Sequence, residues 1–454
     1  MFFSPLVLSW LSGAIFLLLD GRKGNIAWLG AALMIATAAA DLALLGYLVF
    51  ERERAFEVVT GGWPQGVGIR LRIDLLSLFF ASLCALVLAA VMVHEARARK
   101  RFRLFPALVL FLSTGLHGAF FTGDLFNFYV FFELSVITSF ALAAYGYGRR
   151  EIRGAFVYVV VNLFGSVLFL IAVATIYHTT GTLDLDQLAA GVAETGRGTL
   201  VVPAAVLFTG LSIKLGLFPF HGWLPVLYGN ARPAVATALA GALANVGAYG
   251  LLRIGFTALN QARDQGAFLL LFIGSVAAIY GALLAIRRSR PADVAAYAAI
   301  VHAGYIVLAL GIGGLNGIAA LLLIVISGSL DKSTIFLSLE APTFPRGLAS
   351  FVAGSSVAGL PITAGFFAKV QLFRAALEAP AGWAIASALF ASSVLLMGAV
   401  LRLWWLSERS GPRQVQSGAS ALALAGALLL VGLWPDPVVG LVSTIAETMI
   451  GGGT

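Results

Sequence analysis

The sequence predicts an all-α polytopic membrane protein, and three observations carry this prediction. The 454 residues are 60% hydrophobic and 11% charged, with a mean hydropathy of +0.96, whereas soluble domains contain roughly one quarter charged residues. Apolar runs recur along the whole chain, and each is close to the length of about 20 residues that a membrane helix needs. Lysine and arginine are also distributed unequally between alternate loops, as expected when topology follows the positive-inside rule.

The apolar runs predict about 14 transmembrane helices in order along the chain. The first run has no basic segment before it and no small-residue cleavage site after it, so it is interpreted as a helix rather than a signal peptide. The segment 179–199 is expected at the membrane interface, and 436–450 is expected to be a short amphipathic tail. The predicted spans are residues 3–19, 27–50, 73–94, 104–122, 124–147, 154–178, 200–221, 234–257, 267–286, 293–313, 315–339, 348–378, 382–406 and 418–435.

The loop charges predict the orientation of these helices. Counted on alternate sides, one face carries 18 lysines and arginines and the opposite face carries 8. This asymmetry places both termini on the outer side of the inner (plasma) membrane of the cell. The net charge of +8 is therefore explained by the basic residues in the loops on one side of the membrane. No basic cluster is interleaved with aromatic residues, so the expected surroundings are the lipid bilayer, and nucleic acid is not an expected partner.

Three lysines do not fit into any loop. The chain has five lysines, and three of them lie inside predicted spans: Lys214, Lys332 and Lys369. A charged side chain at the centre of the bilayer costs about 2.5–3.5 kcal/mol on insertion scales, so such residues face a protein interior or a wet cavity. Lysine also changes its protonation state readily when it is desolvated. These three residues are the first candidates for a proton-translocation site.

Two predicted spans contain matching helix-breaking residues. Lys214 is followed by Pro219, and the twelfth span carries Pro361 and Gly365 before Lys369. Proline removes a backbone donor and clashes with the preceding turn, so helices seven and twelve are expected to be discontinuous. Paired interruptions of this kind are typical of inverted-repeat transporters, which bind their substrates near the middle of the membrane.

Glu133, in the fifth predicted span, is the carboxylate expected to act with Lys214. A buried glutamate and lysine can form a gate whose charge switches with protonation, while the alternative is a static ion pair that fixes helix packing. Asp331 directly precedes Lys332, and adjacent residues do not share a helix face. We therefore expect these two side chains to address different partners.

The remaining polar candidates have weaker signals. His221 and His302 suit a proton relay, although a histidine bonded within a helix bundle explains them equally well. His117 is interpreted as structural. Asn245 is a candidate relay position that binds water or another helix, since an amide cannot carry the proton itself. Asp124, which follows a glycine between spans four and five, is expected to cap the fifth helix.

Several classes of chemistry are not indicated. The sequence contains no GxxxxGK[ST], HExxH, CxxC or GxSxG motif, and Cys84 is its only cysteine. We therefore expect no cofactor, no metal site and no catalytic residues, and the chain is not predicted to be an enzyme. The energy for transport must then come from an ion gradient or from a partner subunit.

Several motifs resemble the antiporter-like membrane subunits of respiratory complex I, membrane-bound hydrogenases and Mrp-type Na⁺/H⁺ antiporters. The resemblance covers roughly residues 60–410. The segment GDLFNFYVFFE places the family's essential glutamate at Glu133 and favours the D-type branch of the Mrp antiporters. The other motifs are GGWPQGVGIRLRIDLLSLFF at 61–80, KLGLFPFHGWLP with Lys214, AAIVHAGYIVLAL with His302, DKSTIFL with Lys332 and GLPITAGFFAK with Lys369.

The resemblance implies fourteen helices with two inverted five-helix repeats. Helices one to three then occupy 1–103, the first repeat 104–257, the second repeat 258–406, and the last helix with its tail 407–454. It also implies that the chain is the proton-translocating subunit of a multisubunit Na⁺/H⁺ antiporter. Protons are expected to follow a buried axis of glutamate, lysine and histidine side chains, and the expected partners are other membrane subunits.

Two positions depart from the family pattern. Asn245 stands where relatives often carry a lysine in the eighth span, and Gly328 stands where a histidine commonly precedes the eleventh-span lysine by one turn. The proton axis is therefore expected to be interrupted or bridged by water near Asn245. Two alternatives stay open: a proton-pumping subunit of a redox-driven complex, which is then part of a translocase, and a non-conducting scaffold subunit.

Overall fold

The computed structural model describes residues 3–51, 55–63, 68–146, 148–188, 198–379, 381–407 and 418–451. In this part of the chain ten helices are long and apolar enough to cross a membrane. Two C-terminal helices, bent by 79° at a short break, could together form one more span, and two further apolar helices are shorter. The chain is therefore a multi-pass, almost entirely helical membrane protein, while the fourteen-span count stays a prediction.

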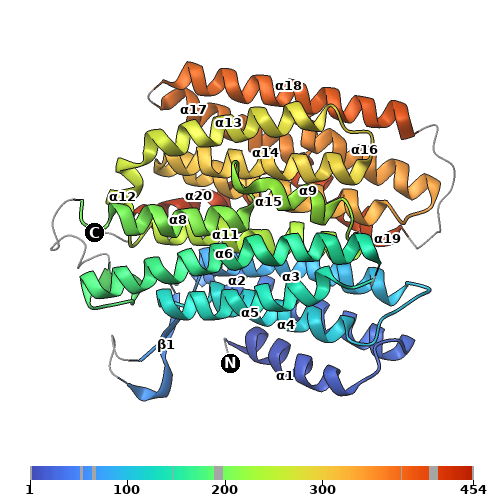
Figure 1. Cartoon of the computed structure of the whole chain (residues 1–454), viewed down its shortest axis with the longest axis horizontal. Coiled ribbons are helices and arrows are strands. Elements are labelled where there is room, and N and C mark those ends of the chain that lie inside the picture. The colour runs from blue at the N-terminus through green and yellow to red at the C-terminus, as the bar shows by residue number, and fades with distance from the viewer. Residues whose placement is uncertain are drawn as a thin grey trace.

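The N-terminal part contains three helices and a hairpin, at the blue end of Figure 1. The first helix packs on the fourth, and the second packs along the third. The elements are α1 (Ser4–Leu18), α2 (Gly24–Glu51), β1 (Ala55–Val59), the 3-10 turn η1 (Thr60–Gly62), β2 (Arg70–Asp74) and α3 (Leu75–Ala96).

The next group of helices includes the first interrupted one. The seventh predicted span, 200–221, contains helix α8 and the start of a 3-10 turn, and a second helix, α9, follows it. The eighth span contains a π-helical stretch, η3. The elements are α4 (Phe105–Phe120), α5 (Leu125–Ala143), α6 (Arg149–Thr180), α8 (Val201–Leu215), η2 (Phe220–Gly222), α9 (Trp223–Tyr228), α10 (Pro233–Thr237), η3 (Ala238–Leu243) and α11 (Ala244–Phe256).

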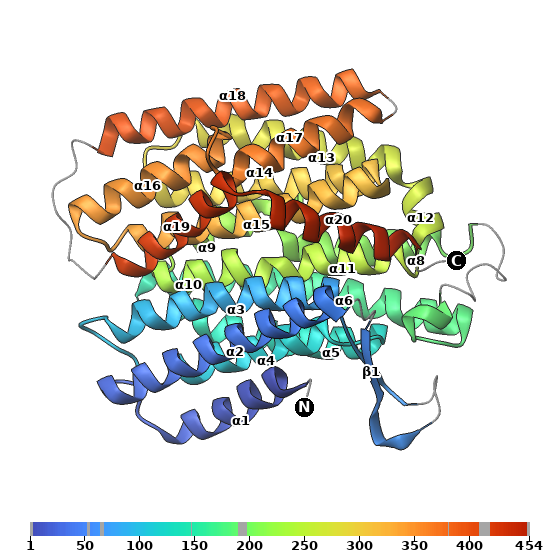
Figure 2. The same cartoon turned by 180° about the vertical axis from the view of Figure 1, so that it is seen from behind.

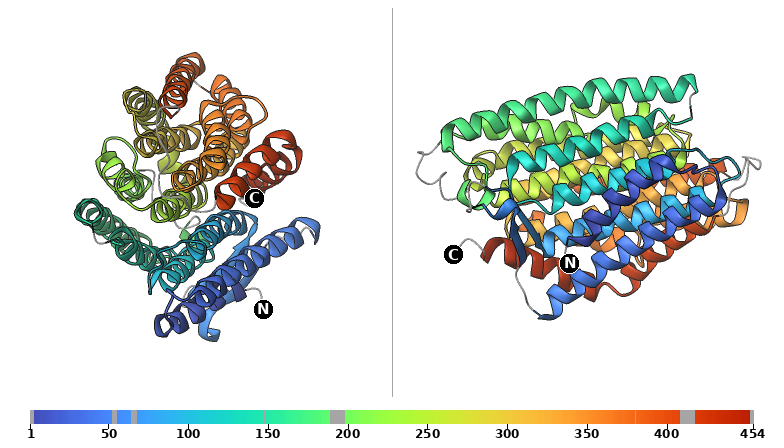
Figure 3. Two further views of the ribbon diagram at one scale, coloured as in Figure 1. Left: turned by 90° about the vertical axis from the view of Figure 1, so that its right-hand side faces the viewer. Right: turned by 90° about the horizontal axis from the view of Figure 1, so that it is seen from below.

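The rest of the chain forms the other side of the molecule. Seen from the end, the helices up to α6 gather on one side and those from α13 to α18 on the other (Figure 3). The last two helices return to pack on α15 (Figure 2). These elements are α12 (Asn260–Gln265), α13 (Ala267–Ala285), α14 (Pro291–Ile312), α15 (Gly314–Ser338), α16 (Thr343–Ala358), α17 (Ala364–Glu378), α18 (Gly382–Ser407), α19 (Ala419–Leu433) and α20 (Asp436–Gly451).

The hairpin corrects the purely helical prediction. Strands β1 and β2 pair antiparallel in the loop between the second and third helices, with Ala55 opposite Asp74 and Val59 opposite Arg70. Hydrophobicity averaged over the length of a membrane span is insensitive to such short strands, because their period is two residues. The hairpin directs the side chains of Arg70 and Arg72 toward acidic groups of the segment 181–188.

Two other segments differ from or limit the predictions. The tail at 436–450 is not merely short and amphipathic: it forms the sixteen-residue helix α20, which buries Val442, Ile445 and Ala446. Of the segment 179–199, residues 189–197 lie outside the described part. Leu183 and Leu185 form backbone hydrogen bonds with the chain around Gly123. Asp124 caps α5 as predicted, since its carboxylate accepts the Asn127 amide at 2.7 Å.

An ion-pair network ties the hairpin to the ends of the neighbouring helices. Arg70, only 3% exposed, donates to Asp184 at 2.9 Å and to Asp186 at 2.5 Å. Burial by itself raises the pKa of Asp186, but the hydrogen bond and charge of Arg70, helped by the charge of Arg72, outweigh it and lower that pKa. Arg70 and Arg72 therefore favour the ionised form of Asp186.

Asp74 joins the same network to α11. Its carboxylate caps α3 by accepting the Ser77 amide at 2.9 Å, and it accepts a 2.6 Å hydrogen bond from Arg253. Burial acts to raise the pKa of Asp74, but Arg253 and Arg72 hold it well below its usual value. The beginning of α3 and the last turn of α11 are thus held together beside the hairpin.

Candidate functional site

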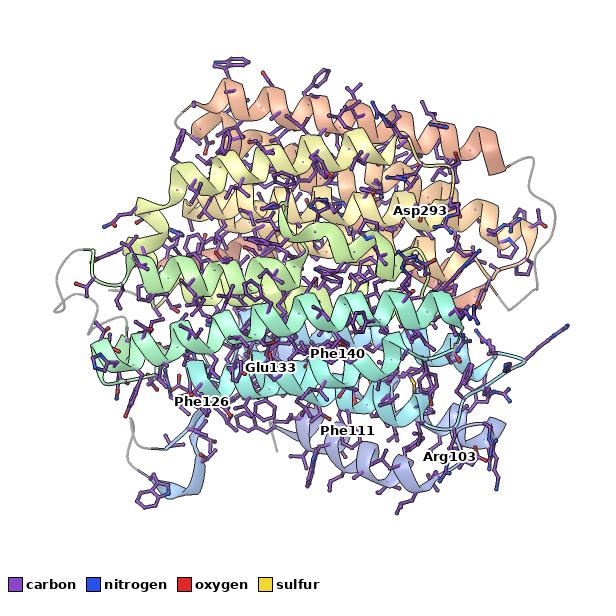
Figure 4. All side chains as sticks on the ribbon, viewed as in Figure 1. Arg103, Phe111, Phe126, Glu133, Phe140 and Asp293 are labelled. Carbon is purple, nitrogen blue, oxygen red and sulfur yellow. The ribbon has the colours of Figure 1, made fainter. Side chains whose placement is uncertain are left out.

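Lys214 is buried near the end of α8 with three polar or aromatic partners. Its amine donates to Ser166 Oγ of α6 at 2.6 Å and to Glu133 Oε1 of α5 at 3.4 Å, and it lies 4.5 Å from the centroid of the Phe132 ring. Glu133 stands between Phe126 and Phe140 along α5 (Figure 4). A buried ammonium needs such compensation, because desolvation costs several kcal/mol per ion. The carboxylate supplies the countercharge and the hydroxyl supplies the shorter hydrogen bond.

The break in this helix begins directly after Lys214. Helix α8 ends at Leu215, and Gly216 has a φ of 75°, a left-handed conformation that favours glycine. A Cβ at Gly216 would collide with the Leu224 side chain. The Trp223 indole donates at 3.0 Å to the Ile213 carbonyl in the last turn of α8, which also accepts the backbone amide of Gly216 at 3.1 Å. Pro219 lies inside the break.

A small cavity adjoins the lysine amine. Its volume is about 10 Å³, which is enough for about one water molecule. The polar side chains in its lining come from α6, α8 and α9: Tyr158, Asn162, Lys214, Trp223 and Tyr228. Because the Asn162 amide and the lysine amine both border this space, a water here finds the polar partners that it needs.

Asn245 bonds across the bundle to α15. Its amide nitrogen donates to Ser329 Oγ at 2.9 Å, and the Ser329 hydroxyl is 3.1 Å from Asn245 Oδ1. The same amide nitrogen donates to the Gly241 carbonyl at 2.9 Å, within the π-helical stretch. Such π turns are frequently found at functional sites. The sequence pattern did not predict this one, because its residues are all small or aliphatic.

A second cavity brings together three residues that the sequence singled out separately. It also measures about 10 Å³ and is bordered by Asn245, His302 and Lys332. Tyr228 and Ala244 line both this cavity and the one beside Lys214. The two water-sized spaces are therefore neighbours with a shared wall. No hydrogen bond or ion pair joins the Lys332 amine to another residue within the described chain.

The His302 ring explains the departure at Gly328. A Cβ placed on Gly328 would lie 3.1 Å from both Cγ and Nδ1 of the His302 ring. The imidazole of α14 thus fills the space next to α15 that a side chain at position 328 would need. His302 Nε2 is 3.9 Å from Asp331 Oδ2, which is an ion-pair distance only if the histidine is charged.

Lys369 is held at the break between α16 and α17. Its amine donates to the carbonyl oxygens of Val357 at 2.9 Å and Ala358 at 3.0 Å. These are the last carbonyls of α16, where the helix dipole favours a cation. Pro361 lies in this break. Gly365 does not: it is the second residue of α17, where its amide donates to Ser356 Oγ at 3.0 Å.

His221 is placed apart from these groups. It borders neither cavity, and its ring lies 4.8 Å from that of Tyr280 and 5.6 Å from that of Phe218. The structure therefore brings Glu133 to Lys214, and Asn245 to His302 and Lys332, but it does not bring His221 to either group. A hydropathy pattern cannot show whether a side chain such as His221 reaches the cavities, because the direction of a side chain after a helix break depends on the backbone of the break.

Besides the network around the hairpin, three further buried acidic or histidine residues in the described part of the chain were not among the sequence-based candidates. Asp41 lies in α2, and His94 and Glu95 lie in the last turn of α3. Glu95 forms an ion pair with Arg232 at 2.9 Å, and His94 Nε2 is 2.9 Å from Glu340 Oε2. Asp41 had a usable signal, since it is an acidic residue in the middle of an apolar run. His94 and Glu95 adjoin a basic loop, which masks them.

Comparison with known proteins gives consistent results. Residues 122–345 match the model of the family described as NADH:quinone oxidoreductase/Mrp antiporter, TM. A Staphylococcus aureus protein assigned as antiporter subunit mnhD2 is 32% identical over 400 residues, which are 82% of this chain and 79% of that protein. The same identity and coverage are found for mnhD2 of strain Newman.

Solved structures share the fold over nearly the whole chain. A chain of the Mrp complex from Dietzia sp. superposes with a TM-score of 0.86 at 23% identity, covering 98% of this chain and 96% of that one. The same values hold for the membrane-bound sulfane sulfur reductase, an archaeal respiratory membrane complex. For respiratory complex I from Thermus thermophilus the TM-score is 0.83 at 23% identity, with 99% of both chains covered.

Proposed function

The chain belongs to the NADH:quinone oxidoreductase/Mrp antiporter family of membrane subunits, in the D-type branch of the Mrp antiporters, and we propose that it moves protons in a Na⁺/H⁺ antiporter. The Staphylococcus aureus relatives are assigned as antiporter subunits, which supports a membrane subunit of a cation/proton antiporter complex. The observation that best supports proton movement by this chain is the Lys214 amine, held between Glu133 and Ser166 beside a water-sized cavity.

The first step of the proposed path is a change of partner at Lys214. While Glu133 is ionised, it stabilises the ammonium form of Lys214 through their 3.4 Å contact. When Glu133 becomes protonated or moves away, that countercharge is lost and the ammonium releases a proton to water in the adjoining cavity. The neutral amine can then accept another proton. The pair thus acts as a gate whose state depends on the charge of the carboxylate.

Water carries the proton past Asn245 in this proposal. The amide is fixed by Ser329 and Gly241 and has no group that can exchange a proton at neutral pH. The second cavity offers room for one water molecule between Asn245, His302 and Lys332. His302, Asp331 and Lys332 form the next stage of the axis, and Lys369 at the second helix break forms the last.

The finer topology belongs to the same proposal. Helical segments occur in all fourteen predicted ranges, which supports fourteen spans, with helices one to three in 1–103 and the last helix in 407–454. The breaks after Lys214 and before Lys369 occupy corresponding positions, as expected for inverted repeats over 104–257 and 258–406. The loop charges support termini on the outer side of the plasma membrane.

A redox-driven role is the second candidate. It is favoured by the likeness in fold to the archaeal respiratory complex and to complex I, which at 23% identity concerns the fold alone. In such a complex the same axis would pump protons without a cation exchange partner. The third possibility, a non-conducting scaffold, rests on the missing lysine at Asn245.

Transport by variants of the whole complex tests the proposal. Glu133→Ala and Lys214→Ala should each reduce Na⁺-driven proton movement in everted vesicles to the level of vesicles without the complex. The physical reason is that each change removes one member of the gate. Lys100→Ala, which changes an exposed loop lysine, is the matched control and should leave transport unchanged.

Full activity in both gate variants, with the complex assembled, would exclude proton movement through this chain and favour the scaffold. Proton movement that needs no Na⁺ but requires an electron donor would favour the redox-driven role.

A further inference from the structure

A second pair of buried ionisable groups lies outside the proposed path. His117 of α4 places Nε2 at 2.9 Å from Oδ2 of Asp41 in α2. The two side chains are 1% and 0% exposed. Ionisable residues inside the membrane are costly, and they are functional more often than not. The sequence favoured a structural role for His117, and the presence of Asp41 is the reason to reconsider it.

The hydrogen bonds determine how many protons this pair holds. His117 Nδ1 is 2.8 Å from the carbonyl oxygen of Ser113 and 3.2 Å from the Ser113 hydroxyl. The shorter contact is to the carbonyl, which only accepts, so when this bond is made Nδ1 carries a hydrogen. The contact between Nε2 and the Asp41 carboxylate then requires one further proton, shared by these two atoms. When both hydrogen bonds are formed, His117 and Asp41 together hold one more proton than a neutral imidazole and an ionised carboxylate do.

The second carboxylate oxygen of Asp41, Oδ1, is buried and accepts no hydrogen bond from the described residues. The uncharged hydroxyl of Ser9 in α1 reaches the site only through Ser113 Oγ, at 3.4 Å. A carboxylate that serves only to fix helix packing would be expected to have both oxygens satisfied.

Asp41 and His117 are linked through α3 to Asn245, the position where the proposed path lacks an ionisable group. Asp41 is the charged group that acts on His117 within the described chain. Helix α2, which carries Asp41, packs along α3, which carries Cys84, and both residues are buried. Cys84 Sγ in turn is 3.6 Å from the amide nitrogen of Asn245. A change of charge at Asp41 therefore changes the electrostatic potential close to Asn245.

We propose that Asp41 and His117 form a second proton-binding site, separate from the path, whose charge controls the step at Asn245. With its proton bound the pair is neutral. When the proton leaves, the negative charge of Asp41 is no longer compensated and stabilises an excess proton on water beside Asn245. The link to transport rests on the proposed function, whereas proton binding by the pair does not.

Infrared difference spectra of the purified complex test proton binding directly. The complex carries isotope-labelled histidine and is titrated between about pH 5 and pH 8, the range in which histidine changes charge. The wild type should give an imidazole signal that is absent from His117→Gln. In Asp41→Asn the side-chain amide can donate to Nε2 in place of the shared proton, so this variant should also lose the signal.

His178→Gln is the matched control, because His178 is an exposed histidine at the end of α6. Its spectrum should lose only the signal of a solvated imidazole. Identical titration signals in the wild type and in the Asp41→Asn or His117→Gln complex, whichever assembles, would overturn the proposal and leave a static ion pair.

Transport measurements test the link to the path. Asp41→Asn should keep Na⁺-driven proton movement but shift its pH optimum, because the charge beside Asn245 no longer changes with pH. An unchanged pH profile in an assembled Asp41→Asn complex would overturn control of the step at Asn245. If transport survives Glu133→Ala, the proposed function fails, while the infrared result for Asp41 and His117 stands by itself.

Discussion

At the scale of single residues, the centre of the molecule is polar but lacks a titratable group at one position. Asn245 binds Ser329 through both atoms of its amide. It is therefore held rigidly next to the cavity that it shares with His302 and Lys332. A fixed amide can orient a water molecule, since it offers both a donor and an acceptor.

Replacing Asn245 by leucine should interrupt transport without unfolding the protein. The change keeps the side-chain size, removes the amide and leaves the Ser329 hydroxyl without its partner, at a cost of about 1–3 kcal/mol. We expect at least a tenfold loss of proton movement in everted vesicles.

Asn230→Leu is the control for this change. The Asn230 amide also donates to a carbonyl four residues earlier, that of Val226 at 2.7 Å, but it lies away from both cavities. Equal transport in the two variants would contradict a role for Asn245 in conduction.

The contact between Gly328 and His302 gives a second prediction at this scale. Gly328→His should overpack the contact with α14, because the His302 ring already occupies that space. Such overpacking costs about 1–3 kcal/mol, and we expect a lower melting temperature of the purified complex. The double variant His302→Ala with Gly328→His should recover most of the loss. If the decreases in melting temperature of the two single variants simply add in the double variant, the two side chains do not compete for the same space.

At the scale of helices, the functional groups lie where regular structure stops. Gly216 ends α8 beside Lys214, and Gly359, with a φ of 82°, ends α16 where Lys369 caps the last carbonyls. A broken helix leaves backbone acceptors free within the membrane, and these must be satisfied by protein groups or water. The lysine at each break is therefore positioned by backbone geometry as well as by its own side-chain partners.

Gly216→Ala should disturb the first break. The left-handed backbone disfavours alanine, and the new methyl group would overlap with Leu224, an overpacking cost of roughly 1–3 kcal/mol. Transport and the melting temperature of the complex should both decrease.

Gly222→Ala serves as the control, because a Cβ there meets nothing within 4 Å and the backbone has an ordinary helical φ of −57°. If both alanine variants behave like the wild type, the geometry of the break does not position Lys214.

At the scale of the whole molecule, the ion-pair network around the hairpin connects elements that are distant in sequence. Arg70 of β2 binds Asp184, and Asp74 binds Arg253 of α11. These contacts join the loop before α3 to the segment after α6 and to the end of α11. In this way one end of the bundle is closed by charge pairs rather than by apolar packing.

Arg70→Gln should weaken this closure, most strongly at a pH where the carboxylates are ionised. It leaves the buried Asp184 carboxylate without its partner, and breaking a buried pair costs about 3–5 kcal/mol. The lowered pKa values of Asp74 and Asp186 contribute stability above their unfolded value of about 3.9, and this stability is lost as the pH falls through the lower folded values. Without Arg70 the pKa of Asp186 is no longer lowered, so we expect the melting temperature to be reduced most near neutral pH and to approach that of the wild type as the pH falls below about 4.

Arg22→Gln is the corresponding control. Arg22 pairs with Asp20 on the exposed surface, where ion pairs contribute little. Its melting temperature should match that of the wild type throughout the pH series. The same pH dependence in both variants would mean that the network around Arg70 does not close the bundle.

Much of the architecture could be predicted because membrane helices are specified locally. Each needs about 20 apolar residues, and the lysines inside the runs stand out because charge in hydrocarbon is rare. The pairing of Glu133 with Lys214 could be predicted as well, and the two groups lie 3.4 Å apart. The hairpin, the π turn before Asn245 and the helix α20 were missed, because their sequences carry no signal at the length of a membrane span.

The sequence by itself determined that this protein is a multi-pass helical subunit of its family and which side chains are ionisable within the membrane. Apart from the pair of Glu133 and Lys214, only the tertiary structure decided which of these side chains meet. It separates His221 from the cavities, places the His302 ring over Gly328 and joins His117 to Asp41. The physical reason is that hydropathy depends on composition along one helix, whereas these contacts depend on the direction of side chains from helices packed against one another.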